Sequence, residues 1–80
     1  MIKVEVLALA TLRRFMPDVK LGKTRLVEVE PGTTMADLRD RLGLPASEVR
    51  VVMRNYVQAE LTDPVQDGDR VAFIPAVAGG

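Results

Sequence analysis

Apolar residues recur at every second position in several stretches of the chain, which is typical of β-strands with one buried face. The predicted strands are residues 2–10, 25–30, 49–54 and 70–74, with a brief further pairing at residues 57–58. Pro17 and Gly22 interrupt the alternation between the first two strands. We therefore predict that a long, partly basic loop over residues 11–24 joins them into a hairpin.

One helix is predicted between the second and third long strands. Its apolar face would consist of Met35, Leu38 and Leu42. Thr33 or Thr34 can cap its start, and Asp37 follows Thr34 by three residues, as in a capping box. Gly43 suits a left-handed C-terminal cap, and Pro45 prevents the helix from continuing.

This order of elements predicts an α+β fold. If the first and last strands lie side by side in the middle of one mixed sheet of four to five strands, the helix covers one face. That arrangement is a β-grasp, or ubiquitin-like, roll. We expect residues 1–75 to form the β-grasp domain and residues 76–80 to form a flexible, reactive tail that ends in two glycines.

The composition excludes several classes of protein. The chain has 80 residues, of which 48% are hydrophobic, and this suits one small domain without a deep pocket of its own. Lysine plus arginine and aspartate plus glutamate number 11 each, so we expect no nucleic-acid partner. No apolar run approaches the length of a membrane span, and no signal peptide is visible. We expect a cytoplasmic protein without a membrane partner.

The side chains offer little ordinary catalytic chemistry. The sequence contains no cysteine and no histidine, which removes the commonest nucleophile, general base and metal ligands. Ser47 is the only serine and has no histidine to activate it. Asp67 and Asp69 flank a glycine, a pattern that favours a turn over a metal site. We therefore expect no bound cofactor, no metal and no enzyme activity of the chain by itself.

The sequence ends in Gly79-Gly80, and this ending is the strongest candidate for chemistry. Glycine has no Cβ, so a chain of glycines can approach the wall of another protein's active site closely. In this interpretation the α-carboxylate of Gly80 is the reactive group. The alternative is a tail that merely frays.

Three local patterns support a family resemblance. They are residues 31–38 (PGTTMADL) at the start of the helix, residues 61–71 (LTDPVQDGDRV) before the last strand, and residues 73–80 (FIPAVAGG) at the end. Together they resemble the ubiquitin-like sulfur carriers of the MoaD and ThiS group, most closely the MoaD branch. Members of this group often have a glycine where this chain has Tyr56. We expect this single tyrosine to cap the small core.

The resemblance implies a specific chemistry at Gly80. An E1-like adenylating enzyme uses ATP to activate the carboxylate, and a sulfur donor system then converts it to a thiocarboxylate. In the MoaD case, a large molybdopterin synthase subunit uses this sulfur to build the molybdenum or tungsten cofactor. The alternatives are a carrier for thiamine thiazole or another sulfur-containing product, a ubiquitin-like modifier that forms isopeptides through Gly80, and a plain interaction module.

The strands also predict a second apolar face, which the helix cannot cover. Its members are Leu7, Leu9, Val52, Ala72 and Ile74. We expect a partner to bind this face and the tail, through Leu7, Val52, Ile74, Pro75, Ala76, Val77, Ala78 and Gly79. The alternative is that the loop carrying Phe15 and Met16 folds over the face.

A basic stretch lies in and after the first loop. It contains Arg13, Arg14, Lys20, Lys23 and Arg25. A solvated loop is the simpler interpretation, and electrostatic steering towards a partner is the alternative.

Overall fold

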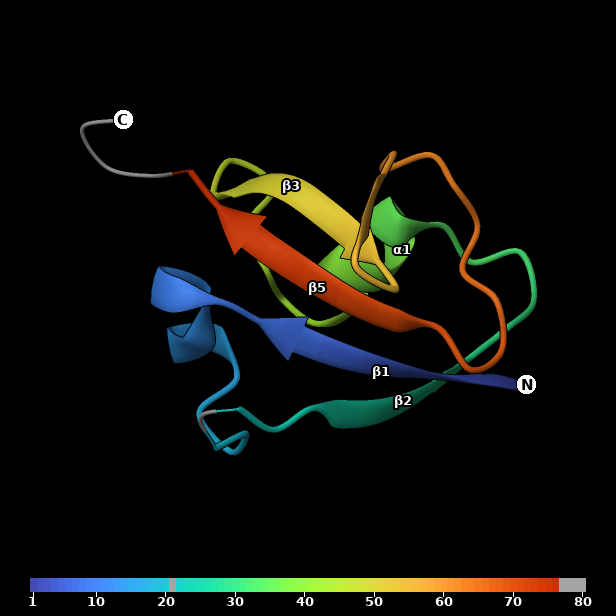
Figure 1. Cartoon of the computed structure of the whole chain (residues 1–80), viewed down its shortest axis with the longest axis horizontal. Coiled ribbons are helices and arrows are strands. Elements are labelled where there is room, and N and C mark those ends of the chain that lie inside the picture. The colour runs from blue at the N-terminus through green and yellow to red at the C-terminus, as the bar shows by residue number, and fades with distance from the viewer. Residues whose placement is uncertain (21, 77–80) are drawn as a thin grey trace.

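Five strands form one mixed sheet in the order β2-β1-β5-β3-β4 in the computed structural model, which describes residues 1–20 and 22–76 (Figure 1). The strands are β1 (Ile2–Ala8), β2 (Arg25–Val29), β3 (Val49–Arg54), β4 (Val57–Ala59) and β5 (Arg70–Pro75). A 3₁₀-helix, η1 (Ala10–Phe15), follows β1, and an α-helix, α1 (Met35–Arg41), lies behind the sheet in Figure 1. The predicted α+β β-grasp roll is confirmed.

The first and last strands pair in parallel at the centre of the sheet, as predicted. Val6 lies opposite Val71 and Ala8 opposite Phe73 in their register. β5 also pairs with β3 in the antiparallel sense, so hydrogen-bonded neighbours flank the last strand on both sides (Figure 1). β1 is two residues shorter than predicted because the chain turns into η1, where Ala10 has a positive φ of 50°.

The core lies between the sheet and α1. Its largest fully buried side chains include Phe73, Leu12, Met16, Met35 and Leu38. Leu12 lies in η1, and Met16 is the residue that follows η1. This segment therefore completes the core on the helix side of the sheet. Phe15 packs against the same cluster. Phe15 and Met16 therefore pack with the core, and their loop borders the second face only at Leu7 and Leu9.

An irregularity in β3 reverses the predicted alternation of that strand. Val49 lies opposite Pro75, whereas Val51 already lies opposite Ile74, so β3 contains one extra residue at this point. Such a bulge shifts the following side chains to the other face of the sheet. Val52 consequently lies opposite Phe73 and is only 1% exposed. The prediction that Val52 lies on the second, partner-binding face was wrong.

The capping of α1 follows the sequence closely. Thr34 Oγ1 accepts a hydrogen bond from the Asp37 backbone N–H at 3.1 Å, and the Asp37 carboxylate accepts one from the Thr34 N–H at 3.2 Å. The hydrogen bond that the carboxylate accepts from the Thr34 N–H, helped by the nearby Thr34 hydroxyl, lowers the pKa of Asp37 below its ordinary value of 3.8. Gly43 has the predicted left-handed conformation, with φ of 77°. Within the described residues, no helix is long and apolar enough to cross a membrane.

Candidate functional site

The candidate site begins where β5 ends. Pro75, the last residue of β5, is buried opposite Val49, and Ala76 is exposed. A hydrogen bond of 3.1 Å from the Leu9 N–H to the Phe73 carbonyl fixes β5 to the chain just beyond β1. The other predicted tail residues are Val77, Ala78, Gly79 and Gly80, and they lie outside the described residues. The division into a domain and a reactive tail therefore stays a prediction.

The sheet face opposite α1, here called the open face, carries a hollow that runs along β5. The hollow is lined by Leu7, Leu9, Met53, Tyr56, Arg70, Ala72 and Ile74. The lining residues that belong to strands, Leu7, Met53, Arg70, Ala72 and Ile74, alternate with buried residues, so they face away from the core. The structure thus brings together four residues of the predicted second face, Leu7, Leu9, Ala72 and Ile74, and replaces Val52 by Met53.

Sequence reasoning missed Met53, Tyr56 and Arg70 in this hollow. The prediction placed Met53 on the core face of its strand. The bulge that reverses the alternation in β3 cannot be recognised from the order of apolar and polar residues. Tyr56 does not cap the core as predicted, because 76% of its surface is exposed. The guanidinium of Arg70 lies 5.4 Å from the centroid of the Tyr56 ring and donates a hydrogen bond of 2.8 Å to the phenol oxygen.

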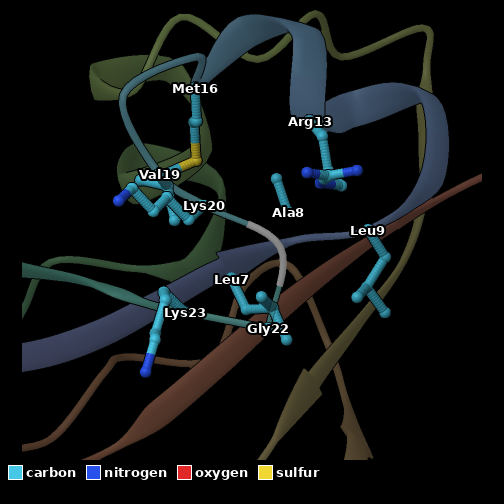
Figure 2. A pocket seen from close by; sticks show the side chains of 9 residues that line it. All are labelled: Leu7, Ala8, Leu9, Arg13, Met16, Val19, Lys20, Gly22 and Lys23. Atoms are coloured by element: carbon cyan, nitrogen blue, oxygen red, sulfur yellow. The ribbon is translucent and has the colours of Figure 1, made fainter.

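A second hollow lies at the end of β1, below the loop that follows η1 (Figure 2). Its floor includes Leu7 and Ala8, and Met16 reaches towards them from above (Figure 2). The cationic lining residues are Arg13, Lys20 and Lys23. The remaining members of the predicted basic stretch form ion pairs, Arg14 with Glu48 and Arg25 with Asp18.

The acidic turn before β5 has a structural role. The Asp67 carboxylate accepts the Lys3 N–H at 2.8 Å, which ties the turn to the start of β1. Asp69 is 7% exposed, accepts the Gln66 N–H at 2.8 Å and forms an ion pair with Arg54 at 3.1 Å. Within residues 1–20 and 22–76, no three histidine, cysteine or acidic side chains are arranged to hold a metal ion. The turn interpretation of these two aspartates is confirmed.

The candidate site is a mainly apolar surface along the last strand of the sheet. Asp67 and Asp69 are engaged in the turn before β5, and the hollow beside β5 is mainly apolar. The central strand runs past this hollow towards the end of the sequence. Fold and site together define a ubiquitin-like β-grasp protein.

Comparison with known proteins gives the family. The model of the ThiS family matches residues 8–80. The chain therefore belongs to the ThiS family and is a sulfur carrier of the MoaD/ThiS type. It is 36% identical to a molybdopterin synthase sulfur carrier subunit of Mycobacterium tuberculosis, in an alignment that covers 100% of both chains. That relative is named as a subunit, which agrees with the expectation of a carrier that is no enzyme by itself.

Solved structures show the same fold. Small archaeal modifier protein 1 of Haloferax volcanii superimposes with a TM-score of 0.73 at 22% identity, covering 96% of this chain and 100% of that one. A chain from the complex of subunits 1 and 2 of the molybdopterin-converting factor from Helicobacter pylori superimposes with a TM-score of 0.62 at 19% identity. The superposition covers 99% of this chain and 100% of that one. At these identities the likeness supports the β-grasp fold alone.

Proposed function

We propose that this protein carries sulfur as a thiocarboxylate on Gly80 and donates it in molybdopterin biosynthesis, as the small subunit of molybdopterin synthase. The observation that carries the proposal is the full-length, 36% identity to a molybdopterin synthase sulfur carrier subunit. The match to the ThiS family, which runs to residue 80, supports it. The sequence adds that no cysteine is present to hold sulfur elsewhere on the chain.

The proposed chemistry has two steps on the chain. A carboxylate is a poor electrophile, so an E1-like adenylating enzyme first joins Gly80 to AMP, with ATP as the source and pyrophosphate as the other product. Sulfur from a donor system then replaces AMP at the acyl carbon. The resulting thiocarboxylate sulfur is a nucleophile that attacks an activated carbon of the pterin in the active site of the large subunit. ATP is consumed by the partner enzyme, and the carrier itself binds no cofactor.

We propose that the large subunit binds the open face and the tail together. Leu7 and Ile74 are partly buried side chains of the hollow, and Ile74 lies directly before Pro75. A partner that covers the hollow therefore receives the chain that leaves β5. The proposed contacts in the tail are Pro75, Ala76, Val77, Ala78 and Gly79. Without a Cβ, Gly79 gives clearance next to the reacting group.

Intact mass spectrometry tests the reactive end. The protein is incubated with ATP, the adenylating enzyme from the same source and a sulfur donor, and the mass increase for one oxygen replaced by sulfur is measured. We expect the native chain to gain this mass and a variant with one alanine appended after Gly80 to gain none. A variant with one alanine inserted after Met1 is the matched control and should load normally. Equal loading of the appended variant would overturn the proposal.

A second measurement identifies the acceptor of the sulfur. Co-purification with a pterin-binding large subunit supports the molybdopterin assignment. Transfer to a thiazole precursor, or a Gly80-dependent ladder of higher-mass conjugates in cell extracts, would instead select one of the two alternative functions. A molybdopterin carrier and a thiazole carrier both form the thiocarboxylate. The identity of the acceptor therefore does not change the result expected for sulfur loading.

A further inference from the structure

The turn between β3 and β4 has an unfavourable residue at its second position. Asn55 and Tyr56 are the only residues between the paired Arg54 and Val57, and both have positive φ, 50° and 72°. This is the geometry of a two-residue type I′ hairpin turn, in which Asn-Gly is the preferred sequence. Asparagine tolerates the left-handed region, whereas a bulky side chain is strained there. Glycine at position 56 would fit the backbone better than tyrosine does.

Asn55 already supplies the structural contacts of the turn. Its N–H donates to the Arg70 carbonyl at 2.8 Å, and its side-chain oxygen accepts the Arg70 N–H at 2.9 Å. Its side-chain amide donates to Asp69 at 3.2 Å. The tyrosine side chain adds nothing to the core, because 76% of Tyr56 is exposed. Neither the turn nor the core accounts for an aromatic residue in a strained conformation.

The neighbours of Tyr56 indicate what the ring does. Arg70 holds it in place, with the guanidinium 5.4 Å from the ring centroid and a hydrogen bond of 2.8 Å to the phenol oxygen. Both side chains line the hollow on the open face, together with Leu7 and Ile74. Within the described residues Arg70 forms no ion pair, although Glu5 lies opposite it on β1. A rigid aromatic ring and a cation without an ion pair among the described residues therefore border an apolar surface.

We propose that Tyr56 and Arg70 form an anchor for the large subunit that receives the tail, and that this contact is the reason for the strained tyrosine. The inference rests on the proposed function. The hollow continues to Ile74, directly before Pro75, so a protein that takes the tail passes over it. Tyrosine and arginine are, with tryptophan, the side chains enriched among energetic hot spots at interfaces. The complementary surface has an apolar side chain for the hollow and a carboxylate beside Arg70.

Substitution of Tyr56 by glycine separates this role from folding. Tyr56→Gly removes the ring but gives the turn its preferred residue, so the midpoint of thermal unfolding should stay the same or rise. The dissociation constant for the large subunit, measured by titration calorimetry with the full chain, should increase about tenfold or more. Tyr56→Phe keeps the ring and should bind within about threefold of the native chain. Arg70→Gln should weaken binding and make it less sensitive to salt.

Val57→Thr is the matched control, since Val57 is 69% exposed, lies next to Tyr56 and does not line the hollow. It should bind as the native chain does. If Tyr56→Gly is stably folded and binds with native affinity, the anchor is overturned while sulfur loading on Gly80 still supports the proposed function. If the native chain neither loads sulfur nor binds the large subunit, the proposed function fails, and the anchor fails with it.

Discussion

The bulge in β3 gives two adjacent valines opposite environments, and this difference can be measured. Val52 is 1% exposed and lies opposite Phe73, whereas Val51 lies on the open face opposite Ile74 and is only partly buried. Truncation of Val52 to alanine removes two buried methyl groups and leaves a cavity, which should cost about 2.5 kcal/mol of unfolding free energy. The same truncation at Val51 should cost about 1 kcal/mol or less, because those methyl groups are already partly solvated.

The comparison is internally controlled, because both variants exchange valine for alanine in the same strand and share the loss of β-propensity. In a domain of this size, the difference between the variants corresponds to about 10 °C in the midpoint of thermal unfolding. Circular dichroism at 222 nm follows the transition, and urea titration gives the free energies. If Val51→Ala were as destabilising as Val52→Ala, or more so, the side-chain register described for β3 would be incorrect.

Two further predictions concern the open face and the helix cap. Leu7→Ser should stay folded with a loss of about 1–2 kcal/mol, because Leu7 is partly buried. The folded variant should bind the proposed large subunit about tenfold more weakly in calorimetry, because Leu7 lines the hollow, and native binding would exclude this residue from the interface. The folded-state pKa of Asp37 is lowered, so its contribution to stability is present above the ordinary carboxyl pKa of 3.8 and is lost as the pH falls through the lower folded value. Between the lowered folded pKa of Asp37 and its ordinary value of 3.8, thermal unfolding of Asp37→Asn should therefore depend less on pH than unfolding of the native chain, and equal pH dependence would contradict the capping contact.

The sequence predicted the fold well where local chemistry determines it. The strands follow from the alternation of apolar residues, and α1 begins at the cap that Thr34 and Asp37 predict. Gly43 ends the helix in the conformation that glycine favours. These features depend on residues a few positions apart, so they are visible without any knowledge of the tertiary structure.

The site was less predictable because its geometry depends on distant segments. One extra residue in β3, opposite the end of β5, decides whether Val52 or Met53 lies on the open face. The position of Tyr56 over Arg70 depends on a turn and a strand that are 14 residues apart. The apolar pattern contains no information on either contact. The reactive role of Gly80 was expected from the sequence ending and stays a proposal, since that residue lies outside the described part of the chain.

The parallel pairing of β1 and β5 has a mechanical consequence for a protein that is held by its tail. A force that pulls the tail away from the start of the chain acts along both strands in opposite directions. It loads the bonds between them, such as Glu5 N–H to Asp69 O at 2.9 Å and Leu9 N–H to Phe73 O at 3.1 Å, in shear. The bonds must then yield together, whereas a strand at the sheet edge can peel away one bond at a time. β5 therefore resists a force between the two ends of the chain better than an edge strand would.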